Sequence, residues 1–400
     1  MSSSLDDRFP IVCFGDDWGK HQTSNQHLMR AFARHGHRVV WINSIGARPP
    51  RLDLGDVRKM ASKLWSALRP ADEPQGNPMV VSPLALPLPH CRWARRMNVH
   101  RLSRHLRGIL QQHDIEHPVL WICGPIAAEF IGTLGEKASV YYCADEYEAL
   151  PRAPVGALRE LEAHALASAD ITLVVSERLL QNKSSQANRI ALLRHGVDHA
   201  HFRRAMLDET CIPAAMADIP QPVIGLIGRI DDWMDTDLLA HIATSRPEWS
   251  IVVVGSLVTR RRAWMKLRNV HCLGPIPYGD LPSYLKAMAA TILPYRLNQQ
   301  TLSCNPLKLR EYLAAGRPVV SVDVPAVQRY LPWVRVAHSA DEFVASIGDA
   351  LRSDGPEQQR ARSESVADES WDQRAEEVVA LLSPDPKSRR EIEASTPGNW

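Results

Sequence analysis

The sequence lacks the features that mark secreted, zinc-binding and membrane-spanning proteins. Its 400 residues include only seven cysteines, which are scattered with no CxxC pair. This spacing favours reduced thiols over a disulfide framework or a zinc site. No apolar run reaches the ~18 residues of a membrane-spanning helix, and the opening MSSSLDDRFP is too polar and acidic for a secretory signal. These absences favour a cytoplasmic protein whose only membrane contact is peripheral.

The weak charge bias and the lack of repeats narrow the possible class of protein further. The formal net charge is only +2, which by itself indicates no nucleic-acid partner. No segment repeats at the spacing of solenoid proteins. The composition, 45% hydrophobic and 23% charged, is that of a globular protein, and 400 residues exceed one ordinary hydrophobic core. Two domains are therefore expected.

Short apolar segments alternate with helical patterns along both halves of the chain. Such segments have the composition of strands buried on both faces, as in parallel sheets. The predicted strands lie at 8–15, 38–43, 118–123, 139–143, 171–176, 222–230, 250–256, 269–274, 290–295 and 318–322. This alternation predicts an α/β fold with two Rossmann-like, doubly wound parallel sheets. The absence of GxGxxG gives no support to a dinucleotide site.

Irregular segments suggest where the domains end. Residues 203–221 contain two prolines and little periodicity, so they are predicted to connect the domains. A polar terminal segment is expected to be disordered. The predicted parts are a first domain (1–202), the connector (203–221), a second domain (222–356), a helical segment that packs back on the first domain (357–382) and the tail (383–400).

The stretch from Asn305 to Asp323, NPLKLREYLAAGRPVVSVD, predicts one helix followed by a buried strand. Asn305 is a suitable N-cap, and Pro306 suits the first helical position. Gly316 is placed to end the helix in a left-handed turn. With the apolar segment before it, this stretch forms one strand–helix–strand unit of a doubly wound domain.

Lys308 stands in the first turn of this helix, where the dipole disfavours a cation by up to ~1 kcal/mol. A bound anion offsets that cost, because the free N–H groups and the ammonium then hold it together. Glu311 lies one turn later on the same face. The two side chains would suit the phosphates and the ribose of a nucleotide diphosphate. The alternative is an exposed Lys308 that pairs only with Glu311.

Other predicted strands of the second half also end in residues that suit a ligand. Gly228 and Arg229 end the segment 222–230, where glycine lets a ligand approach the backbone and arginine can clamp a phosphate. Ser256 follows a glycine at the end of 250–256 and is a further candidate for donor binding.

In the first half, Asp145 directly follows the predicted strand 139–143. Ligands of open α/β sheets bind at the carboxyl ends of strands, and an aspartate there is placed to take a proton from a reacting hydroxyl. Glu146 and Glu148 are neighbours that could compete for this role. The alternative is that Asp145 is only a helix N-cap.

The long loop after the first predicted strand, DDWGKHQTSNQ, would lie at the same edge of its sheet. Asp16 and Asp17 could contact a substrate there or be only turn residues. The further acceptor-side candidates in this loop are Trp18, His21 and Asn25.

Two basic amphipathic helices are predicted at 56–70 and 91–110. They suit docking on an anionic membrane surface, or they cover the sheet with their arginines in water. No nucleic-acid motif accompanies them. A separate group of three histidines has no carboxylate or cysteine partner at ligand spacing, so no metal site is predicted there. These are His195, His199 and His201.

NPLKLREYLAAGRPVV, GVDHAHF (196–202), VIGLIGRI and CADEY together resemble the GT-B glycosyltransferases, specifically bacterial enzymes of exopolysaccharide synthesis. The likeness spans about residues 10–380 and is loosest in the first half. It implies two Rossmann-like domains that face a cleft, with the acceptor on the first and the nucleotide-sugar donor on the second. It also implies that no metal holds the phosphates.

Within this group the sequence is similar to the xanthan-pathway glucuronosyltransferases, peripheral membrane enzymes that invert at the anomeric carbon. The resemblance implies that Asp145 is the catalytic base, that Lys308 contacts the donor phosphates and that Tyr295 lies on the donor side. Ile230 and Ile276 fall where those enzymes line the base pocket.

The sequence is also similar, more loosely, to the retaining family 4 (group 1) glycosyltransferases, which place a carboxylate on the ribose at the position of Glu311. That family has two glutamates eight residues apart, but Ser303 stands eight positions before Glu311. It also carries a lysine shortly after GR, where this chain has GRIDDWMD. Both departures count against retention and leave inversion with Asp145 as base.

The resemblance implies a metal-independent, hexosyltransferase-type enzyme that uses a nucleotide sugar, with UDP favoured, and a lipid-linked or other glycan acceptor. It implies no cofactor, no nucleic-acid partner and a place in the cytoplasm or on the cytoplasmic face of the membrane. Two alternatives stay open. A nucleotide-sugar epimerase of the same fold would need no acceptor, and a non-catalytic GT-B scaffold would bind a nucleotide weakly or not at all.

Overall fold

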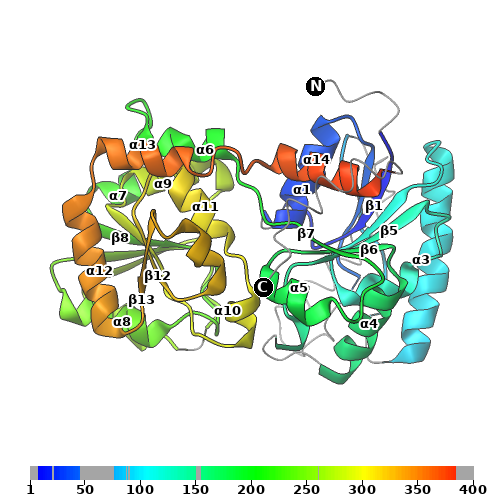
Figure 1. The fold of residues 1–400 in the computed structure, drawn as a ribbon, viewed down its shortest axis with the longest axis horizontal. Helices are drawn as coiled ribbons and strands as arrows, with labels where there is room; N and C mark the ends of the chain where they lie inside the picture. Colours follow the sequence, from blue (N-terminus) through cyan, green and yellow to red (C-terminus); the bar gives the residue numbers. More distant parts are fainter. Residues whose placement is uncertain are drawn as a thin grey trace. The chain divides into compact units, whose positions relative to one another are not determined.

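The computed structural model describes residues 8–19, 22–45, 76–86, 88, 91–149, 155–259 and 261–383. The chain divides into two compact units, one of Met1–Arg194 with Arg374–Trp400 and one of His195–Gln373 (Figure 1). The predicted helix at 56–70, the candidate His21 and the tail from residue 384 lie outside the described residues. In the part that is described, no helix is both long and apolar enough to cross a membrane.

The first unit is built on a seven-stranded sheet in which every neighbouring pair is parallel. Its strands are β1 (Ile11–Phe14), β2 (Val39–Ile42), β3 (Met79–Val81), β4 (Val119–Ile122), β5 (Ala138–Cys143), β6 (Ile171–Val174) and β7 (Ile190–Leu192). The order across the sheet is β3-β2-β1-β4-β5-β6-β7. The apolar residues that predicted these strands are almost all buried, because helices cover both faces.

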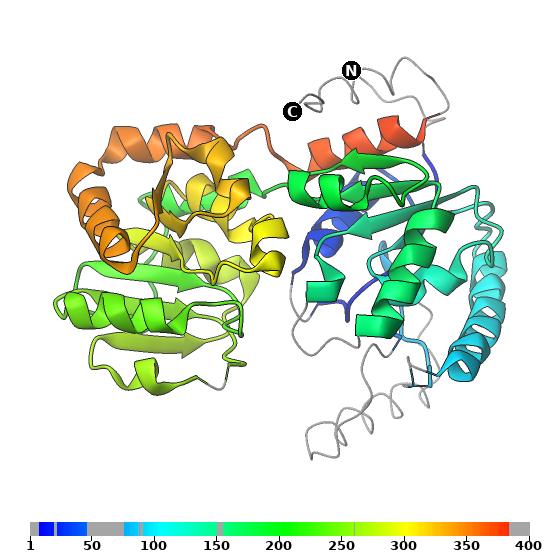
Figure 2. The same ribbon diagram turned by 60° about the horizontal axis from the view of Figure 1, so that its bottom comes forward.

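Helices α1 and α14 lie over one face of this sheet, and α4 and α5 lie over the other (Figure 1). The predicted basic helix at 91–110 is confirmed as α3, which runs along the side of the unit in cyan (Figure 2). The helices are α1 (Ser24–Arg34), α3 (Arg92–Gln112), η2 (Pro125–Phe130), η3 (Tyr147–Ala149), α4 (Val155–Ser168), α5 (Glu177–Lys183) and α14 (Trp371–Leu382).

The second unit holds a six-stranded parallel sheet. Its strands are β8 (Val223–Ile227), β9 (Ser250–Val254), β10 (Val270–Gly274), β11 (Ala290–Leu293), β12 (Val319–Val322) and β13 (Val334–Ala337). The order is β10-β9-β8-β11-β12-β13. Both sheets are parallel and doubly wound, so the predicted α/β fold is confirmed.

In the second unit, α8 and α12 cover one face of the sheet, and α9 and α11 cover the other (Figure 1). The helices are α6 (His199–Arg203), η4 (Arg204–Met206), α7 (Ala214–Ala217), α8 (Thr236–Ser245), η5 (Ala263–Lys266), η6 (Tyr278–Asp280), α9 (Leu281–Lys286), α10 (Gln299–Ser303), α11 (Leu307–Ala314), η7 (Pro325–Tyr330), α12 (Ala340–Ser353) and α13 (Pro356–Glu364).

The domain boundaries differ from the prediction. Residues 203–221 hold η4 and α7, and Met216 is buried in the core of the second unit, so this segment belongs to that unit. The chain passes between the units after Arg194 and again after Gln373. The two prolines stand in a segment of short helices and irregular backbone that belongs to the second unit. Such a segment has too little hydrophobic periodicity to be distinguished from a linker by sequence.

The predicted helical segment 357–382 is two helices, α13 and α14. The break between them pairs with an earlier segment, because Val197 N donates to Glu369 O at 2.7 Å and Val197 bridges to Ser370. Within the first unit, Arg189 Nη1 donates to Leu381 O of α14 at 2.9 Å.

Each sheet changes its winding direction at one pair of strands, β1 and β4 in the first unit and β8 and β11 in the second. Ligands of open α/β sheets bind outside the carboxyl ends of the strands at such a point. The loops after these strands hold several of the candidate residues: Asp17 and Trp18 after β1, Gly228 and Arg229 after β8, and Tyr295 after β11.

Candidate functional site

The loops after β8 and β9 bring two glycines into direct backbone contact. Gly228 N donates to Val254 O at 2.9 Å, and a Cβ on Gly255 would lie 1.8 Å from Gly228 O. Both glycines have positive φ, 151° and 144°, a region that other residues avoid. A Cβ on Gly228 would meet no atom within 4 Å. The backbone at Gly228 is therefore open on the side from which a ligand would approach.

Arg229 follows this open backbone and is held by its own loop. Its Nη2 lies 2.5 Å from Asp231 Oδ2, and its guanidinium carbon lies 5.5 Å from the centre of the Trp233 ring. The side chain is still 45% exposed. Because a guanidinium has five N–H donors, Arg229 keeps donors that a phosphate can use.

The remaining β8–β10 candidates differ in accessibility. Ser256 is half-buried, and its carbonyl accepts a hydrogen bond from Ile230 N at 2.9 Å. Ile230 itself is fully buried in the core of the unit, whereas Ile276 is half-buried. Of the two isoleucines expected to line a base pocket, only Ile276 presents its side chain at the surface; Ile230 packs beneath the loop.

Lys308 and Glu311 form an ion pair on the first turns of α11. Their Nζ and Oε2 atoms lie 2.6 Å apart, with side chains 26% and 9% exposed. This is the pairing that the sequence left open as the alternative, but it is largely buried instead of exposed. A cation held at a helix N-terminus beside a buried carboxylate can still exchange partners with a phosphate, since the helix dipole favours an anion there.

The predicted N-cap is corrected, because α11 begins at Leu307 with Pro306 as the capping residue. Asn305 does not cap the helix; its Oδ1 accepts a hydrogen bond from Arg310 Nη1 at 2.6 Å. The predicted end is confirmed, since Gly316 has φ 70° just after the cap residue Ala315.

A buried network that the sequence did not reveal holds the start of α11. Arg310 is 1% exposed, and its Nε donates to Glu369 Oε2 at 2.6 Å. Tyr330 OH donates to the same carboxylate at 2.7 Å. The network fixes Asn305 and the segment before α11 to the break between α13 and α14, but these partners are too far apart in sequence for any local pattern to show it.

Tyr312 ties α11 to the end of β8. Its OH accepts from Ile227 N at 2.7 Å and donates to Ile227 O at 3.2 Å, one residue before Gly228. Burial also raises the pKa of Tyr295 well above its ordinary value, and Glu311 is near enough to add to that shift. Tyr295, Glu311 and the open glycine therefore belong to one corner of the second unit. The sequence analysis did not single out Tyr312.

Asp145 is the one acid of the CADEY segment without a cation beside it. Its carboxylate is half-buried and makes no hydrogen bond or ion pair within the part of the chain that the structure describes. Burial, with a further contribution from the negative charge of Asp16, raises its pKa to about 7. A pKa near neutrality is what an efficient general base requires.

The two neighbouring glutamates are already committed to cations. Glu146 is buried, and its Oε1 lies 2.5 Å from Lys183 Nζ, which also contacts Glu162 Oε2 at 2.9 Å. Glu148 receives two hydrogen bonds from Arg159, and these lower the pKa of Glu148. Of these three acids, only Asp145 has no cation at hydrogen-bond distance within the described residues.

The loop after β1 is held by a local network. Trp18 N donates to Asn43 Oδ1 at 2.8 Å, and its ring stacks edge-on against Trp41 with centroids 4.8 Å apart. The backbone carbonyl of Asp17 accepts a hydrogen bond from Gln26 Nε2 at 3.5 Å. Asn25 is 7% exposed, and its Oδ1 has no hydrogen-bond partner in the described residues. Asn25 thus starts α1 as a buried residue beside this loop.

The three histidines of 195–201 have ordinary structural contacts. His199 Nε2 lies 3.0 Å from Ser363 O, and His201 stacks on Tyr278 with centroids 4.7 Å apart. No group of three or more His, Cys, Asp or Glu side chains in the described chain is arranged to hold a metal ion.

Residues 221–353 match the family described as "Glycosyl transferases group 1". This segment contains β8 to β13 and most of α12, and with them α11 and the Lys308–Glu311 pair. The "Putative teichuronic acid biosynthesis glycosyltransferase TuaH" of Bacillus subtilis (strain 168) is 29% identical over 153 residues, which are 36% of this chain and 38% of that protein. The match therefore covers well under half of that relative.

Solved structures share the fold over nearly the whole chain. Sucrose-phosphate synthase from Thermosynechococcus elongatus has a TM-score of 0.69 at 16% identity and covers 97% of this chain and 100% of its own. Anabaena HepE in complex with UDP and glucose has a TM-score of 0.59 at 12% identity and covers 97% and 99%. Identities this low establish the fold alone. The chain thus has a GT-B-like fold, and its residues 221–353 are similar to the group 1 glycosyl transferases.

Proposed function

We propose that this protein is a metal-independent glycosyltransferase that moves a sugar from a nucleotide diphosphate to a lipid-linked glycan in cell-surface polysaccharide synthesis. The observation that carries the proposal is the Lys308–Glu311 pair on the first turns of α11, inside the group 1 domain. The Bacillus subtilis relative is named for teichuronic acid biosynthesis, which supports a polysaccharide product.

In this proposal the donor diphosphate lies at the carboxyl ends of β8 and β11. Lys308, the first N–H groups of α11 and Arg229 neutralise its charge, which grows as the glycosidic bond to phosphate breaks. Gly228 leaves room for the donor, and Glu311 exchanges Lys308 for the ribose hydroxyls. UDP is the favoured nucleotide because HepE, which shares the fold, was solved with UDP and glucose.

Asp145 acts as the base in the transfer step. Its carboxylate takes the proton of the acceptor hydroxyl, the acceptor oxygen bonds to the anomeric carbon, and the nucleoside diphosphate leaves with the electron pair of the broken bond. One displacement inverts the anomeric configuration. A lipid-linked acceptor also places the enzyme at the inner surface of the membrane as a peripheral protein.

A thermal-shift panel tests the donor site. UDP, GDP, ADP, TDP and their common sugar conjugates are compared on the wild type, on Lys308→Ala and on Lys266→Ala, an exposed lysine of the same unit. A ligand at 100 times its Kd adds ~2.7 kcal/mol to the free energy of unfolding, which is readily seen as a rise in Tm. We expect uridine nucleotides to stabilise the wild type and Lys266→Ala, with a collapsed shift in Lys308→Ala.

Two outcomes of the panel would contradict the proposal. If no nucleotide raises the Tm of the wild type, α11 does not bind a diphosphate, and the chain is a non-catalytic scaffold of the same fold. If both lysine variants respond like the wild type, the phosphates bind elsewhere.

A further inference from the structure

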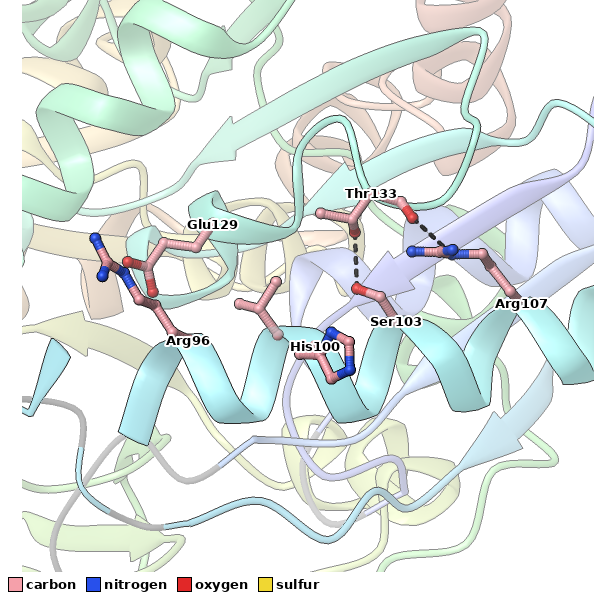
Figure 3. A pocket seen from close by; sticks show the side chains of 7 residues that line it. Arg96, His100, Ser103, Arg107, Glu129 and Thr133 are labelled. Atoms are coloured by element: carbon pink, nitrogen blue, oxygen red, sulfur yellow. Dashed lines mark hydrogen bonds between the residues drawn. The ribbon is translucent and has the colours of Figure 1, made fainter. Parts of the chain in front are cut away.

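An open cavity of about 300 Å³ lies between α3 and η2 in the first unit, apart from the loops that carry the candidate site. Its polar lining comes from one side of α3 and from the η2 segment that faces it (Figure 3). The polar lining residues are Arg96, His100, Ser103, Arg107, Glu129 and Thr133.

Two of these side chains are already fixed by hydrogen bonds that shape the cavity. Ser103 Oγ donates to Thr133 Oγ1 at 2.9 Å, and Arg107 Nε donates to Thr133 O at 3.0 Å (Figure 3). The Arg107 guanidinium is therefore anchored by one nitrogen and keeps its terminal N–H groups for another acceptor. An anchored arginine loses less conformational freedom when it binds an anion.

Arg96 lies at the other end of the cavity and is exposed. It has no hydrogen bond or ion pair in the portion of the chain that the structure covers, and His100 between the two arginines has none either. The only acid in the lining, Glu129, lies 3.0 Å from the buried Arg95 Nε. The cavity thus has an excess of positive charge that no acid of its own lining neutralises.

Helix α3 as a whole also carries an excess of positive charge. Its 21 residues, Arg92–Gln112, include six arginines and two histidines but no aspartate or glutamate. Arg96 and Arg107 stand three turns apart on the cavity side, which is ~16 Å along a helix axis. This span exceeds one phosphate group and fits an extended anion or two neighbouring ones.

We infer that this cavity is a second anion site, which binds phosphate groups between Arg96 and Arg107 and is separate from the donor site. The chemistry is shared by a soluble diphosphate and by the headgroups of anionic lipids. On the same helix, Trp93, 64% exposed, precedes Arg96 by about one turn, and Met97, 38% exposed, follows it directly, so an interfacial lipid is a source that the test must include. The inference does not depend on transferase activity.

The test compares two charge-matched double variants of α3. Arg96→Gln/Arg107→Gln removes both arginines of the cavity, whereas Arg101→Gln/Arg104→Gln removes two exposed arginines of the same helix that do not line it. Pyrophosphate binding is measured by calorimetry, and vesicle binding by co-sedimentation with phosphatidylcholine vesicles that contain or lack phosphatidylglycerol. Lys308→Ala is the background in all samples, so the donor site does not contribute.

We expect the cavity variant to bind at least ~10-fold more weakly, which corresponds to ~1.4 kcal/mol, while the control variant changes less than ~3-fold. Pyrophosphate binding that only the cavity variant loses identifies a soluble phosphate ligand. Loss confined to phosphatidylglycerol vesicles identifies lipid headgroups, and both results support the inference. The single variant Arg96→Gln breaks no hydrogen bond of the described chain. Weaker binding by this variant therefore cannot be attributed to misfolding.

Equal losses in the two double variants would mean only diffuse attraction to the helix and would overturn the inference. So would the absence of binding to both probes in the Lys308→Ala background.

Discussion

At the scale of single residues, Asp145 is distinguished by what surrounds it. Glu146 and Glu148 each have a cation at hydrogen-bond distance, whereas Asp145 has burial and the like charge of Asp16. Burial and like charge both disfavour the carboxylate, and together they raise its pKa to about 7. Lys183 and Arg159 neutralise the neighbours, so Asp145 is left as the candidate base of the proposed reaction.

The first prediction concerns Asp145→Asn. It should lower kcat by about 10²–10⁴-fold, the usual contribution of a general base, while nucleotide binding stays unchanged. The wild-type kcat/KM should rise with pH and level off above about 7, where Asp145 is ionised. Glu148→Gln is the matched control, and a loss of similar size there would remove the basis for assigning the base to Asp145.

The same substitution also predicts a stability effect with a definite sign. An aspartate of the unfolded chain has a pKa of ~3.9, so between that value and about 7 the folded protein binds more protons at Asp145. The contribution of Asp145 to the free energy of unfolding is therefore greatest below the lower pKa. It decreases as pH rises from the lower pKa to the upper one. Urea unfolding should therefore show a larger gain for Asp145→Asn at pH 8 than at pH 5.

At the scale of elements, the position of α11 depends on two anchors outside the helix. Tyr312 joins it to the end of β8, and Arg310 joins its first turns to Glu369 in the break between α13 and α14. Glu311 lies between these anchors in sequence, and Lys308 stands two residues before the first of them. The donor candidates are thus held by contacts that a reading of the helix alone does not contain.

Arg310→Leu should destabilise the protein strongly. The arginine is 1% exposed, and removing one partner of a buried pair costs ~3–5 kcal/mol. Glu369 would keep only the more distant Arg329, whose Nε lies 3.7 Å from Oε1. Arg352→Leu is the control, since Arg352 pairs with Asp349 on the surface and such pairs contribute ~0–1 kcal/mol. Chemical unfolding measures both. Equal effects would show that Glu369 finds another partner.

Gly255→Ala tests the contact between the loops after β8 and β9. A Cβ there would lie 1.8 Å from Gly228 O, and φ is 144°. Strained backbone alone costs ~1–3 kcal/mol, so Tm and nucleotide affinity should both fall. Gly279→Ala, where a Cβ meets no atom within 4 Å, should change neither. An unaltered affinity in Gly255→Ala would separate this loop from the donor site.

Hydrophobic periodicity and the glycines and prolines at element ends predicted most helices and strands, but not the contacts between them. The segment 318–322 became β12 and Gly316 ends α11 with φ 70°, because both signals are local. The three-residue strand β3 and the strand β13, whose apolar residues are interrupted by Arg335, were not predicted. The pairing of Lys308 with Glu311 was one of two open alternatives, since sequence spacing fixes which side chains are neighbours but not which partner each one takes.

At the scale of the whole molecule, the proposed chemistry is divided between the units. The first unit holds the candidate base after β5, and the second holds a cation and a carboxylate at the start of α11. The chain crosses between the units twice, after Arg194 and after Gln373. The proposed transferase needs both a donor and an acceptor for reaction, whereas an epimerase of the same fold would turn over a nucleotide sugar alone.

The most direct measurement is sugar transfer from labelled UDP-sugars to a polyprenyl-diphosphate-linked glycan, with the anomeric configuration of the product read by NMR. We predict acceptor-dependent release of UDP, a product with inverted configuration and no turnover in Asp145→Asn. Turnover of the nucleotide sugar without acceptor, or a product of retained configuration, would contradict the account of Asp145 as the base of a single displacement.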